Sequence, residues 1–150
     1  MLIHSPRNTL KKSNILKKRD LIVQALRYGK LFKQGSIKIN IYLREKQTSS
    51  NNSVLNFKES NYQVAFLVNK RFGKKAVTRN YIKRVLRELF RKNKEKFPLN
   101  SNIIISVTMK YSLVDYNILK QDFDGLLTSE KYNDFLNKTL SENDLTNEGR

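Results

Sequence analysis

The side chains best suited to chemistry in this sequence are arginines and lysines that recur at helical spacing between positions 79 and 91. At 100° per residue, these cations and one asparagine fall within an arc of roughly 140° on one side of a helix. The arc consists of Arg79, Asn80, Lys83, Arg84, Arg87 and Arg91. A guanidinium group donates two parallel hydrogen bonds to a phosphate, and an amide can read a ribose hydroxyl or a base edge. The arc therefore predicts binding to nucleic acid.

Four more cations surround Gly73 in the segment immediately before this helix. They are Lys70, Arg71, Lys74 and Lys75. Because backbone N–H groups at a helix N-terminus attract anions, this segment predicts a second set of phosphate contacts. It is not a nucleotide-binding P-loop, since Val68 stands where that loop requires its first glycine.

The charge balance favours binding over an ordinary solvated surface. Residues 70–96 hold 12 basic and 2 acidic side chains, too few acids for the pairs that normally stabilise an exposed helix. The chain of 150 residues carries 30 basic and 13 acidic side chains, a net charge of +17. A polyanion is the simplest compensation for self-repulsion of this size. Nucleic acid is the first candidate partner, and an anionic membrane surface is the second.

Catalysis by the protein alone is not expected. The chain has no cysteine and one histidine, His4, and the acids of its basic half are scattered. We therefore predict no catalytic residue, no metal site and no organic cofactor in the protein. No apolar segment approaches the roughly 18 residues that a membrane span needs, and the N-terminus lacks the apolar core of a signal peptide. We expect a soluble, cytoplasmic protein with no membrane association.

A sheet must position the basic helix, because the side of that helix opposite the arc is apolar. Hydrophobic periodicity predicts helices at 18–28, 77–94 and 115–127, and strands at 30–33, 36–43, 62–68 and 103–107. The order α-β-β-β-α-β-α predicts one α+β domain, a two-layer sandwich over residues 1–150 with its core at about 10–127. We expect a flexible loop at 44–61 and an acidic polar tail at 128–150, with a short helix possible at 130–140 and the last ten residues disordered.

The strand at 36–43 alternates strictly, so that its two faces differ. Its isoleucines point to one side, which we assign to the core. Lys38, Asn40 and Tyr42 point to the other side, which we expect to be open, as in an antiparallel sheet with one solvated face.

The segment Val64–Phe90 resembles the signature of the bacterial ribonuclease P protein component. In that family a strand leads through a lysine-rich, glycine-containing turn into a helix that begins with arginine-asparagine-arginine, and here the turn is 70–75 and the helix contains Arg79 and Asn80. The segment from Leu16 to Lys30 is similar to that family's first helix. The similarity runs from about residue 10 to residue 127.

The resemblance implies a fold and a function. The strands before and after the basic helix would be parallel, with a left-handed crossover. The basic loop and helix would face a catalytic RNA subunit, and a cleft between the first helix and the open sheet face would hold the 5′ leader of precursor tRNA. The RNA would perform the hydrolysis with Mg²⁺, which it would mainly hold, and no obligate protein partner is implied. The leader contacts would be Lys17, Ile22, Leu26, Lys38, Asn40 and Tyr42.

The sequence departs from the family pattern at four positions. Tyr81 stands in place of the motif's second arginine, and it lies outside the arc. Ile22 and Leu26 stand in place of two phenylalanines, so they offer apolar contact without the π-face that base stacking needs. Asn40 stands in place of a tyrosine on the sheet face.

Two other functions are compatible with a basic surface. A non-catalytic ribosomal protein or RNA chaperone would need the same cations, and composition does not separate it from a ribonuclease P subunit. A peripheral membrane protein could lay the basic helix flat on anionic lipid. Against this reading, the apolar side of the helix is needed to cover the sheet.

Overall fold

The computed structural model describes residues 10–44 and 62–148, and it confirms the predicted order of elements. The α-helices are α1 (Arg19–Tyr28), α2 (Ala76–Lys92), α3 (Tyr116–Leu127) and α4 (Glu130–Glu148). The strands are β1 (Lys30–Gln34), β2 (Ile37–Leu43), β3 (Gln63–Leu67) and β4 (Ser101–Val107). Short 3-10 helices are η1 (Lys12–Asn14), η3 (Lys70–Phe72), η4 (Lys94–Lys96) and η5 (Tyr111–Leu113). His4 and, apart from Arg44, the predicted flexible loop lie outside the described residues.

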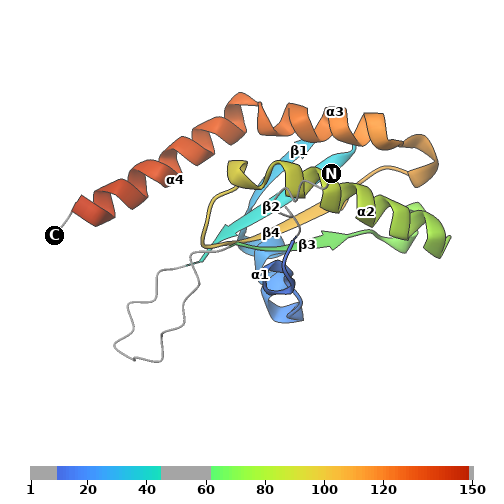
Figure 1. Cartoon of the computed structure of the whole chain (residues 1–150), viewed down its shortest axis with the longest axis horizontal. Helices are drawn as coiled ribbons and strands as arrows, with labels where there is room; N and C mark the ends of the chain where they lie inside the picture. The colour runs from blue at the N-terminus through green and yellow to red at the C-terminus, as the bar shows by residue number, and fades with distance from the viewer. Residues whose placement is uncertain (1–9, 45–61, 149–150) are drawn as a thin grey trace, which may run out of the picture.

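The four strands form one sheet in the order β1-β2-β4-β3 (Figure 1). β2 is antiparallel to both β1 and β4, whereas β3 is parallel to β4. The parallel pair is joined through α2, as the resemblance implied. β4 lies in the middle of the sheet, which explains its β-branched sequence, and only Ser106 among its residues is not fully buried.

The main core lies between one face of the sheet and the helices α2 and α3 (Figure 1). β2 contributes its isoleucines at 37, 39 and 41, and β4 contributes Ile103 and Ile105. α2 contributes Ile82, Val85, Leu86, Leu89 and Phe90, the apolar side predicted from its periodicity. Burial of this stripe fixes the rotation of α2, so the opposite side of the helix must face solvent.

α1 packs on the other face of the sheet, which is therefore less open than predicted (Figure 1). Ala25 is buried against Ala65 and Ile104, forming a second, smaller core. Asn40 on this face is only 3 % exposed, so the prediction that its side chain is open to solvent is wrong. Small residues allow the close approach: a Cβ on Gly29 would lie 3.0 Å from the Ile41 carbonyl oxygen. α1 thus adds a partial third layer to the predicted sandwich.

α4 is longer than the short helix at 130–140 that the sequence allowed, and it extends into the last ten residues, where disorder was predicted. It runs from residue 130 to residue 148. Tyr132 is fully buried, and its ring packs edge-on against Phe32 with centroids 5.2 Å apart. Its hydroxyl donates a hydrogen bond to the Lys96 carbonyl oxygen at 2.8 Å. Phe135, one turn further, also contacts Phe32 at 5.2 Å. The aromatic side chains anchor the first turns of α4 to the core, and the helix continues beyond them.

Two local contacts complete the sheet. The turn between β1 and β2 contains Gly35, whose φ of 55° favours glycine, and the carboxylate of Asp122 from α3 accepts hydrogen bonds from the backbone and hydroxyl of Ser36 at 2.8 and 2.7 Å. On the opposite edge, the backbone at Ile15 and Leu16 pairs with Val64 of β3, with the Leu16 N–H donating to the Val64 carbonyl at 2.8 Å. No helix among the described residues is long and apolar enough to cross a membrane.

Candidate RNA interface

The predicted arc lies on the solvent side of α2. Asn80, Lys83, Arg84 and Arg87 are exposed, while the opposite side of the helix is buried in the core. Within residues 10–44 and 62–148, no ion pair involves Lys83, Arg84 or Arg87. The Arg87 guanidinium lies 5.9 Å from the centre of the Phe66 ring on β3, which steers that side chain toward the sheet edge. The middle of the arc therefore presents cations whose charge no described acid neutralises.

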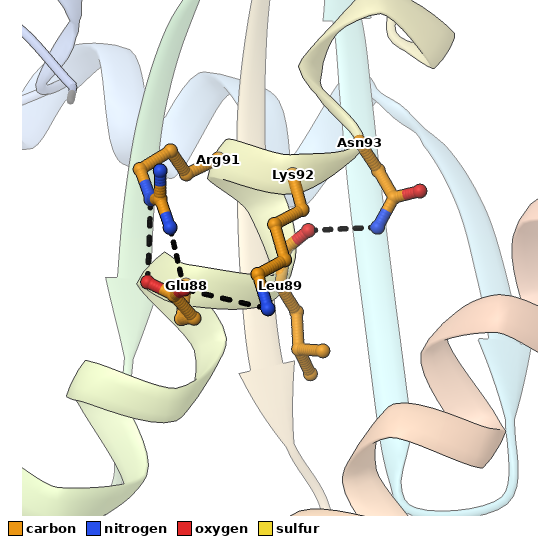
Figure 2. Close-up of polar contacts among 5 residues, drawn as sticks. All are labelled: Glu88, Leu89, Arg91, Lys92 and Asn93. Atoms are coloured by element: carbon orange, nitrogen blue, oxygen red, sulfur yellow. Dashed lines mark hydrogen bonds and ion pairs between the residues drawn. The ribbon is translucent and has the colours of Figure 1, made fainter. Parts of the chain in front are cut away.

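The C-terminal end of the arc is partly neutralised (Figure 2). Arg91 forms an ion pair and two hydrogen bonds with Glu88, and Lys92 Nζ lies 3.6 Å from the same carboxylate. The hydrogen bond from Arg91 is the largest influence on the Glu88 carboxyl, and it lowers the pKa of that group despite an opposing contribution from burial. Arg91 consequently offers less net charge to a phosphate than Arg84 or Arg87 does.

The N-terminal end of the arc has a structural task that periodicity did not reveal. The Arg79 guanidinium donates hydrogen bonds to the carbonyl oxygens of Gly73 and Lys74, at 3.1 and 2.7 Å. These bonds tie the first turn of α2 to the loop that precedes it. Arg79 is half-buried, so it contributes to a binding surface mainly by holding the loop in place.

The loop from 69 to 75 is built on Tyr111 of η5. The Tyr111 hydroxyl donates to the Asn69 carbonyl oxygen at 3.0 Å, and the Asn69 side chain accepts from the Arg71 N–H at 2.8 Å. Gly73 lies directly on the Tyr111 ring, since a Cβ there would be 2.3 Å from ring carbon Cδ2. Burial raises the pKa of the Tyr111 hydroxyl, as its largest influence. The loop backbone is therefore pinned at three points: the hydrogen bond from Tyr111 to Asn69, the hydrogen bond from Arg71 to Asn69, and the contact of Gly73 with the Tyr111 ring.

The four predicted loop cations all point to solvent from this pinned backbone. Lys70, Arg71, Lys74 and Lys75 are exposed. No side chain caps the N-terminus of α2, and its first turn contains no acid. Unpaired N–H groups there and the surrounding cations together make a positively charged end of the helix, the kind of site that phosphate occupies.

The six predicted leader contacts differ in exposure, because α1 packs on the face of the sheet opposite the main core. Lys17 is exposed, Leu26 is 41 % exposed, and Lys38 is half-buried. Ile22 packs against the small core under α1, and the Tyr42 hydroxyl accepts a hydrogen bond from Gln24 of α1 at 3.3 Å. The predicted residues thus lie around α1: Lys17 and Leu26 are exposed, Ile22, Lys38 and Tyr42 are half-buried, and Asn40 is buried.

Asn102 is a polar residue in this region that the sequence analysis missed. It lies on β4 opposite Tyr42 and is 1 % exposed. Neither polar atom of its side chain has a hydrogen-bond partner, and the same is true of the Asn40 side-chain oxygen. Buried amides without partners are costly, so they mark a place where a further hydrogen-bonding group is needed. The available signal was an asparagine at the start of the apolar run 103–105.

Comparison with known proteins identifies the family. The family model named Ribonuclease P matches residues 10–131, more than half of the chain. This chain belongs to the ribonuclease P protein family. The ribonuclease P protein component of Syntrophus aciditrophicus (strain SB) is 32 % identical over 125 residues, covering 83 % of this chain and 93 % of that relative. The one from Petrotoga mobilis is 37 % identical over 62 residues, covering 39 % and 52 %.

Solved structures of ribonuclease P proteins share the fold. The Staphylococcus aureus protein matches with a TM-score of 0.60 at 20 % identity, covering 77 % of this chain and 94 % of that one. The Thermotoga maritima protein matches with a TM-score of 0.57 at 22 % identity, covering 75 % and 94 %. Ribonuclease P protein components belong to an endoribonuclease of tRNA processing and work in a complex with the ribonuclease P RNA. α4 extends well beyond the matched residues.

Proposed function

We propose that this chain binds the catalytic RNA of ribonuclease P through the loop at 70–75 and the arc of α2, and that it holds the 5′ leader of precursor tRNA beside α1. The observation that carries the proposal is the group of exposed cations Lys83, Arg84 and Arg87, which have no described ion-pair partner on a helix whose other side is fixed in the core. Because the helix backbone is already ordered, these cations can bind ribose-phosphate without the entropy cost of ordering the protein backbone.

The leader would contact the exposed rim of the α1 side first. Lys17 and Lys38 would bind phosphate, and Leu26 would make apolar contact with a base. Asn40 and Asn102 would hydrogen-bond to a base only after α1 or the Tyr42 ring moved aside, because both asparagines are buried. Their unpartnered amide atoms supply the energetic reason for such a movement.

The hydrolysis would take place on the RNA, in the cytoplasm, with Mg²⁺ held mainly by RNA groups. The metal supplies charge neutralisation and an activated water in such reactions. No group of three or more histidines, cysteines or carboxylates that could hold a metal occurs in the part of the chain that the structure describes. The protein's role in the reaction would be electrostatic. Its cations would reduce the repulsion between two RNA polyanions, so that less free Mg²⁺ is needed.

Reconstitution tests this function. Precursor tRNA and catalytic RNA are incubated at low Mg²⁺ with and without the protein, and the rate of 5′ cleavage is measured. We expect the protein to raise this rate. No rise would refute the proposal, and RNA binding without a rise would fit a ribosomal protein or RNA chaperone instead. Co-sedimentation with anionic liposomes as strong as binding to RNA would favour the membrane alternative.

Two arginine variants distinguish a side chain that contacts RNA from one that holds the loop in place. Arg84→Ala should weaken RNA binding roughly fivefold and lower the salt slope by about 1, with unchanged thermal stability, because Arg84 is exposed and unpaired among the described residues. Arg79→Ala should weaken RNA binding and also lower the melting temperature, because it releases the loop carbonyls. Lys138→Ala on α4 is the matched control, with the loss of one exposed cation. An equal loss of stability in the Arg84 and Arg79 variants would contradict this assignment.

A further inference from the structure

A hollow of about 470 Å³ lies beyond the C-terminal end of α2, where η1, the residue before β3, and η4 meet. It is lined by Phe97, which is buried and packs on Phe90 with centroids 4.7 Å apart. It is also lined by Tyr62, which is half-buried and packs edge-on against the same Phe90 at 5.2 Å. Leu99 lines the hollow and is 58 % exposed. Leu99 and part of Tyr62 thus expose apolar surface on a very basic protein.

The charged groups around the hollow are Lys11, Lys94 and Glu95. Within the described parts of the chain none of the three forms an ion pair, although they line the same hollow. The backbone of Tyr62 is held in place independently of them, because the Asn14 side chain donates a hydrogen bond to the Tyr62 carbonyl oxygen at 3.0 Å. Two cations and a carboxylate are therefore available to a ligand on a fixed apolar surface.

We infer that this hollow binds one unpaired nucleotide of an RNA. The base would lie against Tyr62 and Leu99, since aromatic side chains take any base by stacking. Lys11 and Lys94 would hold its phosphate, and Glu95 would accept a hydrogen bond from a ribose hydroxyl or an exocyclic amine. The volume lies within the range of roughly 300–1,000 Å³ that small ligands occupy.

The position of the hollow suits an RNA that is already bound. Tyr62 packs with Phe90 on the α2 side of the sheet, the face opposite α1 and the proposed leader surface. The hollow follows directly on the basic helix, because η4 begins two residues after α2 ends. RNA lying along the arc would therefore reach the hollow at the end of the helix. The inference rests on the proposed RNA binding, and the nucleotide could come from the catalytic RNA or from precursor tRNA.

Directed cleavage identifies which RNA supplies the nucleotide. The chain contains no cysteine, so Ser13→Cys, on an exposed residue of η1, can carry a single iron-EDTA group that cuts nearby RNA irrespective of base. The reconstituted complex is probed twice, with the label on the catalytic RNA or on precursor tRNA. We expect focused cleavage of a single-stranded stretch in one of the two, and its loss when Leu99→Asp is added. Asn137→Cys on α4 is the control. Uniform weak cleavage in both RNAs would overturn the inference.

Binding to decauridylate at several salt concentrations gives a second test. Lys11→Ala/Lys94→Ala should weaken binding about tenfold and lower the salt slope by about 1.4, as expected for two contacts to single-stranded phosphate. Lys131→Ala/Lys138→Ala on α4 removes the same charge elsewhere and should change the slope by less than about 0.5. Equal effects of the two double variants would refute the nucleotide site.

The same titration separates this inference from the proposed function. Lys83→Ala/Arg84→Ala alters the arc and leaves the hollow intact. If this variant weakens binding while the Lys11→Ala/Lys94→Ala variant matches its α4 control, only the inference of a nucleotide site in the hollow is refuted. If the arc variant has no effect either, the proposed RNA surface itself fails. Thermal unfolding of each variant, expected to match the parent protein, excludes loss of folding as the cause.

Discussion

Replacement of Gly73 by alanine tests whether the Tyr111 ring pins the RNA-facing loop. The φ of Gly73 is −171°, an extended value open to any residue, so the glycine is required for space alone. The added Cβ would lie 2.3 Å from Tyr111 Cδ2, more than 1 Å short of ordinary contact at 3.4–4 Å. Tyr111 is buried and cannot yield without losing its hydrogen bond to Asn69.

The magnitude follows from these two contacts. Overpacking of a buried site costs about 1–3 kcal/mol, and the lost hydrogen bond costs about 1 kcal/mol more. Gly73→Ala should therefore lower the free energy of unfolding by about 2–4 kcal/mol and the melting temperature by roughly 5–15 °C. Thermal unfolding followed by circular dichroism measures both. RNA affinity should fall too, because the loop cations depend on this backbone.

Gly125→Ala in α3 is the matched control, since it is the same chemical change in an uncrowded place. The nearest atom to its Cβ would be Gln34 Nε2 at 3.5 Å, the end of a flexible side chain. Alanine in a helix interior should raise stability by about 0.5–1 kcal/mol. A loss below about 1 kcal/mol in Gly73→Ala would show that the ring moves freely and that the loop is not pinned by it.

Three further predictions concern the rest of the fold. Tyr132→Phe should cost about 1 kcal/mol in thermal unfolding, because it leaves the Lys96 carbonyl without its donor; no change would mean that α4 is held by ring packing alone. Asp122→Asn should cost about 1–2 kcal/mol in denaturant unfolding, since one acceptor oxygen serves two donors of Ser36; a Ser36→Ala background should reduce that cost. Glu88 has a lowered pKa, so its stabilising effect is present above its unfolded pKa and is lost as pH falls through the folded one. Glu88→Gln should thus be less stable than the parent by under about 1 kcal/mol at pH 7, and the melting temperatures of the two should converge as the pH falls through the lowered pKa of Glu88.

The sequence predicted those features that follow from periodicity. The apolar stripe of α2 and the inward isoleucines of β2 were found correctly, because burial on one side imposes a period that is visible in residue types. The exposed middle of the arc follows from the same geometry. The parallel pairing of the strands before and after the basic helix did not follow from periodicity; the family resemblance implied it, and β3 and β4 are indeed parallel.

The features that sequence reasoning missed depend on contacts between distant segments. Alternation in β2 cannot tell whether α1 covers the second face, and α1 does so at Asn40. The position of Arg79 on a helical wheel does not reveal that its guanidinium turns back to the preceding loop. The sequence allowed only a short helix at 130–140 followed by disorder, because acidic and polar residues outnumber the apolar ones there, whereas α4 runs to residue 148 and is anchored by Tyr132 and Phe135.

The short backbone pairing of Ile15 and Leu16 with Val64 has a consequence for how the protein behaves in isolation. It shields part of the outer rim of β3, whose N–H and C=O groups could otherwise recruit a strand from a second molecule. The opposite rim, β1, displays Lys30 and Lys33, whose like charges discourage such pairing. A protein shortened to begin at residue 17 would therefore tend to aggregate. Weak RNA binding by that protein would reflect aggregation rather than the loss of an RNA contact made by the removed residues.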